Sequence, residues 1–387
     1  MHPTPATDAE DLYEPTERPP LHYAEQALLG AVLLQPALLP AVEDICPSSF
    51  DSPVHAAVFA AMQEVSAPEV MATSAGLNWL TAVLAKARPQ APGLTPSYMH
   101  TLISACPQPQ HVAAYAVVIR AEHARRTICL HAEQLAQAAT DITVPDRPRH
   151  TLTAADTLAT HLDHLAERFP SHARPLPRTP LPRTPLPPAP RPAERDEDRE
   201  AEQWLLACAV SRPEQVQGMR WLTADDFLDP VHAGLWQAVT ALTHRGDPVD
   251  PVTMLWEAQQ RGLLATGIAP DDVIALLSEP VGSADYWGER LLERNLLTRA
   301  LLAARQITAY TADPANTVHQ LVTGSRRALA DLHNVRSRWQ TATRPLPASP
   351  SSAESTTSPR AGPRSPLTTQ RAPVPTPARQ PTAGRVP

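Results

Sequence analysis

The histidines His55 and His232 are the first candidates for chemistry, because each follows the same Pro-Val dipeptide and precedes an alanine. An imidazole can act as a general acid or base near neutral pH. Both fall at the third position of an expected helix, where the positive end of the helix dipole disfavours the imidazolium. We therefore expect neutral, hydrogen-bonded, half-buried histidines beside Phe59 and Trp236, and the sequence predicts no catalytic residue.

Other chemically capable pairs also favour structural roles. His161 and His164 are spaced as neighbours on one helix face, with Asp163 between them, but a metal site needs a further ligand and none lies nearby in the sequence. We expect a solvated face there. The adjacent carboxylates Asp225-Asp226 and Asp271-Asp272 are expected at helix N-termini, where the dipole favours negative charge, rather than as acid/base pairs. No metal and no cofactor is predicted.

Nucleotide hydrolysis would require a glycine-rich loop with a lysine that reaches the β- and γ-phosphates. The single lysine of the chain, Lys86, lies between alanines in a helix-like stretch, and no GxxxxGK[ST] motif exists. The 4 cysteines are scattered without a CxxC pair, which favours a reducing compartment over disulfides or zinc. With an acidic N-terminus and no run approaching a membrane span, we expect a cytoplasmic protein with no membrane partner.

The chain contains an internal duplication. Residues 24–62 align with residues 201–239 without a gap at a constant offset of 177, and 12 of the 39 positions are identical. The matches form clusters in register: Ala-Glu-Gln at 24 and 201, Leu-Leu at 28 and 205, and Pro-Val-His-Ala at 53 and 230. A period this long indicates duplicated domains rather than a solenoid of short units.

Proline-rich segments divide the chain. Residues 169–196 hold 10 prolines, with PLPRT twice in tandem from Pro175 to Thr184, and residues 341–387 hold 11. Proline lacks an N–H and fixes φ, so neither segment can join a helix interior. We expect a semi-stiff spacer, with docking of PLPRT as the alternative, and a disordered tail. The predicted organisation is a disordered N-terminus (1–20), a first domain (21–169), a linker (170–196), a second domain (197–338) and a disordered tail (339–387).

The charge of the chain is unevenly distributed. The blocks 24–168 and 197–338 carry net charges of about −5 and −6, whereas the tail 341–387 carries 6 arginines against 1 glutamate. Acidic folded domains are poor at gripping a phosphate backbone. Any DNA contact is therefore expected to be weak and to come from the basic tail, although these arginines also serve simply to keep a proline-rich segment solvated.

The periodicity predicts an all-α fold of two tandem helical bundles, each ending in a helical hairpin. Ser52-Pro53 and Asp229-Pro230 are typical of helix starts, with a capping side chain followed by proline in the first turn. The hairpin helices are expected at 111–139, 152–169, 286–310 and 316–335. Their apolar stripes are narrow, so each hairpin needs a partner helix pair from the other domain or from another chain.

In the order and spacing of its motifs, the chain resembles the N-terminal domain of replicative DNA helicases of the DnaB type. The opening Ala-Glu-Gln with its leucines occurs at 24–34 and 201–210, and the Phe, Pro, His, aromatic run begins at Phe50 and Phe227. Gly246 to Thr253 and Arg261 to Leu264 resemble the next signature, of which the first copy keeps a degraded version at 67–88. Ala-Tyr-Ala at 114–116 and Ala-Asp-Tyr at 284–286 resemble the start of the hairpin.

The resemblance implies an all-α globule with a hairpin that builds the collar of a hexameric ring and docks primase or loaders. It also implies a RecA-like motor, for which we find no sequence, so we expect no ATPase or helicase activity from this chain. The expected partners are a replicative helicase and/or primase, and other copies through the hairpins. A DNA-binding accessory factor and a motor-less helicase subunit are the alternatives.

The hairpin helices carry two arginine pairs, Arg125-Arg126 and Arg326-Arg327. We expect these to form interhelical ion pairs or to be solvated, with DNA contact as the alternative. The candidate interaction residues are Tyr115, Arg125, Arg126, Leu158, Leu162, Leu165, Tyr286, Leu321, Arg326, Arg327, Leu329 and Leu332.

Overall fold

The computed structural model describes residues 18–68, 73–169, 181–187 and 196–344. Within these residues every regular element is a helix, which confirms the predicted all-α class. The disorder predicted for the N-terminus and the tail falls mainly on residues 1–17 and 345–387, and the first PLPRT on 175–179; all of these lie outside the described residues. No helix among the described residues is long and apolar enough to cross a membrane.

The first copy of the duplicated unit consists of a helical globule followed by a hairpin. Its elements are α1 (Pro20–Leu34), η1 (Pro36–Val42), η2 (Pro47–Ser49), α2 (Pro53–Glu64), α3 (Thr73–Ala87), α4 (Pro96–Ser104), η3 (Pro109–His111), α5 (Val112–Thr140) and α6 (Arg147–Arg168). The short stretch after α1, which contains Pro40, forms the 3₁₀ segment η1 rather than an α-helix.

The second copy follows the same plan. Its elements are α7 (Asp196–Ser211), α8 (Pro213–Val216), η4 (Ala224–Asp226), α9 (Pro230–Arg245), α10 (Pro251–Gln260), η5 (Leu263–Thr266), α11 (Pro270–Ser278), α12 (Ala284–Ala312) and α13 (Val318–Ala342). Helix α13 extends beyond its expected end at Val335 into the predicted tail. Trp339 packs against the core, and Arg338 donates to the carbonyl of Trp221 (3.1 Å) and to the Asp226 carboxylate (2.5 Å).

The helix starts agree with the capping chemistry in the sequence. The Ser52 side chain accepts a hydrogen bond from the His55 amide at the start of α2, and the Asp229 side chain accepts one from Val231 at the start of α9. Thr317 and Gln320 form a reciprocal capping box at the start of α13. These local bonds satisfy amides that have no partner within their own helix.

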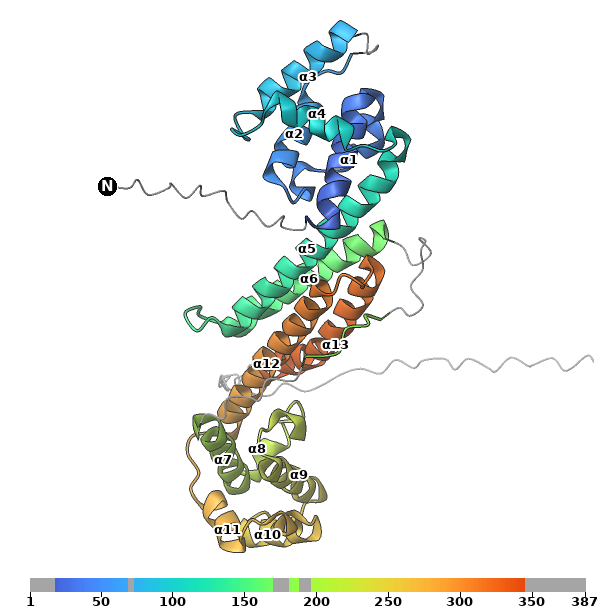
Figure 1. The fold of residues 1–387 in the computed structure, drawn as a ribbon. Coiled ribbons are helices and arrows are strands. Elements are labelled where there is room, and N and C mark those ends of the chain that lie inside the picture. Colours follow the sequence, from blue (N-terminus) through green and yellow to red (C-terminus); the bar gives the residue numbers. More distant parts are fainter. Residues whose placement is uncertain (1–17, 69–72, 170–180, 188–195, 345–387) are drawn as a thin grey trace, which may run out of the picture. The chain divides into compact units, whose positions relative to one another are not determined.

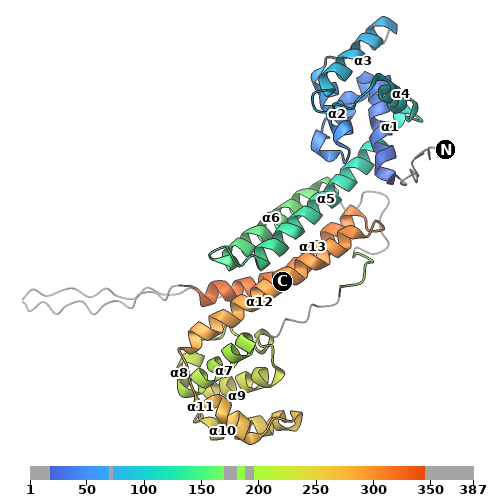
Figure 2. The same ribbon diagram turned by 60° about the vertical axis from the view of Figure 1, so that its left-hand side comes forward.

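The described residues form two apolar cores, and the boundary between them falls within α5 rather than between the two copies. One core belongs to the first globule and includes the start of α5, with Val112, Ala116 and Ile119. The other core begins at Ala124 of the same helix and joins both hairpins to the second globule. In Figures 1 and 2 the α5–α6 hairpin lies alongside α12–α13. The partner that each hairpin requires is therefore the hairpin of the other copy.

A close approach between α1 and α4 generates a first prediction. A Cβ added at Gly30 would lie 2.1 Å from the Leu102 carbonyl oxygen and 2.9 Å from the Cys106 Cβ, so Gly30→Ala must push the two helices apart. Although alanine favours helices, we expect a loss of about 1–3 kcal/mol of unfolding free energy. Thermal melts should show a lower Tm for this variant than for Gly93→Ala, where the new methyl meets no atom within 4 Å. Equal Tm values would contradict the packing described.

Candidate interaction site: the paired hairpins

The interface between the two hairpins is built on an apolar core. Helix α5 packs against α12, and α6 packs against α13. Five of the predicted leucines are buried in this core, and Leu329 is half-buried against it. The buried five are Leu158, Leu162, Leu165, Leu321 and Leu332. The apolar stripe predicted from the sequence is thus covered within the same chain.

Ion pairs at the edge of this interface show the direction of the helices. Arg326 of α13 pairs with Asp163 of α6, and Arg336 pairs with Asp156, with a second contact at 2.9 Å. Residue numbers rise along α13 as they fall along α6, so these helices are antiparallel and the two hairpins are related by an approximate two-fold axis. Such exposed pairs contribute about 0–1 kcal/mol each, so they fix register more than they add stability.

Arg125 provides the main polar link between the copies. Its guanidinium lies on α5 and donates hydrogen bonds to the carbonyls of Thr311 (3.0 Å), Asp313 (2.8 Å) and Asn316 (2.6 Å) in the α12–α13 turn. The Thr311 and Asp313 carbonyls lie at the C-terminal end of α12, where backbone acceptors lack partners within the helix, and Asn316 lies just ahead of α13. A planar fork of donors suits several acceptors at once. The residue is therefore a cross-copy anchor, a role that neither ion pairing nor DNA contact anticipated.

Arg126 has a different role, within its own copy. It donates to the carbonyls of Ser49 (2.5 Å) and Phe50 (3.3 Å), in the loop ahead of α2. In the second copy Arg294 of α12 donates to the carbonyl of Asp226 (2.7 Å), at the corresponding place ahead of α9. Each hairpin is thus fixed to its own globule by an arginine on its first helix.

The repeated histidines are parts of buried pairs with the repeated glutamates. His55 Nδ1 lies 2.6 Å from Glu25, and His232 Nδ1 lies 2.9 Å from Glu202, with all four side chains buried. The other ring nitrogen of His55 lies 2.7 Å from the Tyr98 hydroxyl. The expectation that these histidines are hydrogen-bonded is confirmed, but the expected half-burial was wrong, because both imidazoles are buried against a carboxylate.

Each glutamate also accepts backbone amides from the loop that leads into the histidine helix. Glu25 accepts from Asp51 (2.5 Å), and Glu202 accepts from Leu228 (2.6 Å). Burial raises the pKa of Glu202, but hydrogen bonds from His232, the Leu228 amide and Arg294 outweigh it, so its pKa lies below the ordinary value. The sequence signal was present: the glutamate and the histidine recur in both copies, 30 residues apart.

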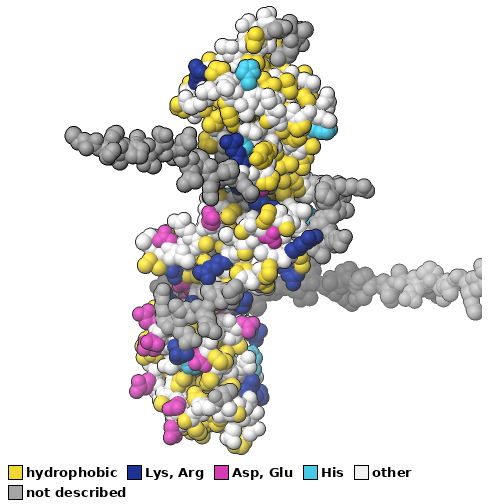
Figure 3. All heavy atoms as spheres, in the orientation of Figure 1, with side chains coloured by type: hydrophobic (Ala, Val, Ile, Leu, Met, Phe, Trp, Pro, Cys, Tyr) yellow, Lys and Arg dark blue, Asp and Glu magenta, His cyan; other side chains and the backbone are white. Residues whose placement is uncertain are grey.

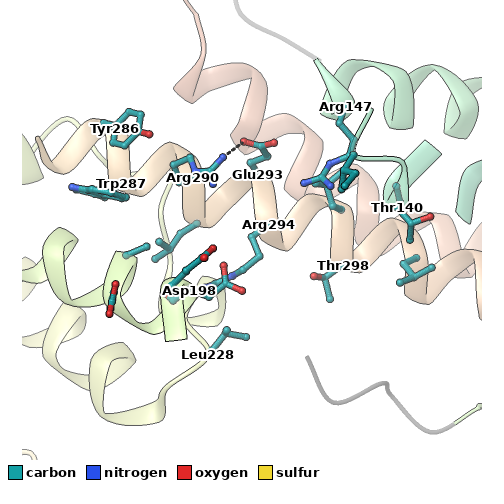
Figure 4. Close-up of a pocket in the computed structure, with 18 of the residues that line it drawn as sticks. Thr140, Arg147, Asp198, Leu228, Tyr286, Trp287, Arg290, Glu293, Arg294 and Thr298 are labelled. Carbon is teal, nitrogen blue, oxygen red and sulfur yellow. Dashed lines mark hydrogen bonds and ion pairs between the residues drawn. The ribbon is translucent and has the colours of Figure 1, made fainter. Parts of the chain in front are cut away.

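The predicted residues that remain are distributed over separate places. The Tyr115 hydroxyl donates to the Gln108 carbonyl at 3.3 Å in its own copy, Arg327 is exposed on α13, and Tyr286 is exposed at the start of α12. Tyr286 borders an open groove of ≈ 660 Å³, which Figure 4 shows between α12, α7 and the start of α6. Trp287 lies beside it, and its ring is 4.6 Å from that of Trp204.

The histidine pair on α6 is less solvated than its spacing indicated. His161 is half-buried, with Nε2 2.9 Å from the Thr127 hydroxyl and its ring 4.8 Å from that of His131. Burial, followed by the neighbouring histidines, lowers the pKa of His161 to about 4. His164 is exposed, as expected. In the described ranges no group of His, Cys, Asp and Glu side chains could hold a metal ion.

Both acidic pairs lie in the first turn of a helix, as predicted, but they differ in burial and in their partners. Asp271 and Asp272 lie exposed in the first turn of α11, as the dipole argument predicts. Asp226 is buried, closes a capping box with Thr223 and pairs with Arg338. Figure 3 shows Asp and Glu side chains gathered over part of the second globule, whereas the first globule displays mostly hydrophobic and uncharged groups. On the face shown, neither globule presents a concentrated basic surface.

The fold and the site together define a class: a duplicated all-helical domain whose copies assemble through helical hairpins. The chain belongs to the family described as the DnaB-like helicase N-terminal domain, whose model matches residues 17–121 and 194–287. Among curated proteins, "Replicative DNA helicase DnaB" of Mycobacterium leprae (strain TN) is 31% identical over 117 residues. This match covers 30% of the chain and 19% of that helicase, about a fifth of its length. No solved structure gives a significant match.

The cross-copy contacts of Arg125 generate a second prediction. A protease site introduced between residues 171 and 174 would allow the backbone between the two copies to be cleaved. Residues 181–187 would then remain attached to the second copy. The shared core should keep the fragments together as a 1:1 complex in native mass spectrometry. Arg125→Met removes three charge-assisted hydrogen bonds and should weaken this complex by roughly 2 kcal/mol or more, about thirtyfold in Kd. The control Arg327→Met, on an exposed side chain, should leave the Kd unchanged; fragments that separate without any substitution would refute the shared core.

The low pKa of His161 generates a third prediction. Between pH 6.5 and 4 the unfolded chain takes up a proton at this imidazole that the folded chain does not, so stability should fall as the pH falls. His161→Gln retains a partner for Thr127 without a titrating group and should flatten this part of the Tm-versus-pH curve. His164→Gln, on an exposed residue of the same helix, serves as the control. An unchanged slope in His161→Gln would show that His161 does not titrate in this range.

Proposed function

We propose that this chain is a non-catalytic assembly module of the DNA replication machinery, in which one polypeptide supplies a ready-made pair of collar-type domains. The observation that carries the proposal is the pairing of the two hairpins within the chain. Two copies of a replication-helicase domain share one core and are linked by Arg125. A paired unit of this kind would be equivalent to a dimer formed by two separate collar domains.

The proposed partner is a replicative helicase and/or a primase. The family match supports a role beside a helicase, because the domain is named for the N-terminal part of that enzyme. The apolar face of each hairpin is already covered by the other copy, so self-association through the hairpins takes place inside one chain. The outer surfaces of the globules would then be the parts that meet a different protein.

A second function, DNA contact, is favoured by one observation of the sequence. Residues 341–387 carry 6 arginines and 1 glutamate, against acidic folded domains. Contacts of arginine with phosphates release counterions, so such binding would weaken steeply with salt. The tail would then hold the assembly near its template while the paired domains hold the protein partner. A motor-less subunit of a helicase ring is a further form of the same role.

The partner proposal has a direct test. The full chain should form a complex of defined stoichiometry with the replicative helicase or the primase of its own organism, measured by light scattering after size-exclusion chromatography. A chain ending at Arg344 should keep this complex, because the paired domains are intact, and should lose salt-sensitive binding to DNA. Failure to bind either protein would refute the assembly role, and DNA binding that survives the truncation would rule out the tail.

A further inference from the structure

The second PLPRT copy in the linker lies against the end of the α12–α13 hairpin. Its backbone forms hydrogen bonds with two buried amide side chains of that hairpin. The Arg183 amide donates to Oδ1 of Asn316 at 3.0 Å, and Gln320 Nε2 donates to the Leu181 carbonyl at 3.1 Å. Asn316 and Gln320 are each 1% exposed. Buried amide groups of this kind require partners, and the linker backbone supplies them.

The Thr184 hydroxyl is held as both donor and acceptor. It donates to Oδ2 of Asp313 at 2.7 Å and accepts from Nδ2 of Asn316 at 2.8 Å. The bond from this hydroxyl, with the Ala315 amide, lowers the pKa of Asp313, which keeps the acceptor ionised. A valine of the same shape could make neither bond, so the site distinguishes a hydroxyl from a methyl group.

The proline of the segment occupies space left by a missing side chain. A Cβ on Gly324 of α13 would lie 2.4 Å from Cγ of Pro182, and the edge of the Tyr310 ring would lie 3.0 Å away. Only glycine at this position lets the proline ring approach the helix so closely. Glycine in a helix interior carries a cost relative to alanine, so its presence here is explained by the docked segment.

The first copy of the domain does not offer the same site. Its hairpin turn keeps an aspartate, Asp141, which accepts an amide two residues on, as Asp313 does. Residues 142–153, which form the rest of that turn and the start of α6, contain no Asn, Gln or Gly. The groups that contact the linker backbone and the proline are therefore particular to the second hairpin.

We propose that the end of the α12–α13 hairpin is a binding site for an extended Leu-Pro-Arg-Thr segment, and that the two tandem copies of this segment compete for it. Leu176–Thr179 has the same sequence as Leu181–Thr184 and is also flanked by prolines. Every contact described uses the backbone, the proline ring or the threonine hydroxyl, and all of these are identical in the two segments. The alternative occupant is therefore built into the chain.

Exchange of the two segments changes the length of the tether on each side of the site. Docking of Leu176–Thr179 would move five residues from the α6 side of the linker to the α7 side, about 15 Å of extended proline-rich chain. Arg125 binds backbone carbonyls of the same turn, whereas the linker is held by the Asp313, Asn316 and Gln320 side chains, so the shared core need not open for the linker to change register. The linker would therefore have two docked registers, which differ in the length of chain on either side of the site.

Hydrogen exchange of the full chain can identify which segment is bound, because prolines leave few amides in the linker. In the wild type the Arg183 amide should exchange slowly. In Thr184→Val the protection should move to the Arg178 amide, whose exchange should slow by roughly tenfold, the effect expected for loss of a paired hydroxyl. Thr179→Val should leave Arg183 protected, and the double variant Thr179→Val/Thr184→Val should protect neither.

A variant of the site itself provides the matched control. Gly324→Ala should release both segments while α13 remains folded, since alanine is the better helix former; circular dichroism melts verify the fold. Protection of Arg183 that persists in Gly324→Ala would overturn the site. Protection that fails to appear at Arg178 in Thr184→Val would overturn the competition. Rescue by Thr184→Ser, which restores the hydroxyl, would support both.

Discussion

The structure depends on one constraint: each hairpin has an apolar stripe that two helices cannot bury by themselves. The duplication meets this constraint inside a single chain, because the linker keeps the second hairpin at a high effective concentration near the first. The buried leucines provide the driving force, the edge ion pairs set an antiparallel register, and Arg125 closes the end of the partner hairpin. The pairing joins two copies of a domain that belongs to the DnaB-like helicase N-terminal domain family.

Inside each globule, a second kind of polar interaction fixes how the helices meet. A buried glutamate on the first helix binds the histidine at the start of the next long helix and also takes up the amides ahead of it. An arginine from the hairpin reaches the same loop in both copies. Each buried carboxyl group is therefore surrounded by hydrogen-bond donors, which is the condition under which burial of a polar group is tolerated. The glutamate and the histidine of each pair are residue types that can do acid/base chemistry, yet here their contacts join the first helix to the loop and helix that follow.

Much of the fold could be predicted from local signals. Ser52 and Asp229 mark helix starts through their own backbone neighbours, and the stripe of Leu158, Leu162 and Leu165 requires only helical periodicity. The contacts that were missed join residues far apart in the sequence. Arg125 binds carbonyls nearly two hundred residues away, and nothing in its neighbourhood indicates that target. The docking of Leu181–Thr184 depends on Gly324 and Asn316, which contact this segment only when the hairpin is folded.

The order of the two hairpins along the chain has a consequence for biosynthesis. Helix α6 ends at Arg168, and its cover is complete only when Ala342 has been made. At roughly 5–20 residues per second, a ribosome needs about 10–30 s to synthesise the intervening segment. During that interval the apolar leucine stripe of α6 is exposed on the nascent chain, because the hairpin that buries it has not yet been synthesised. Neighbouring nascent chains could cover one another, so a chaperone or rapid elongation would favour the correct, self-paired product.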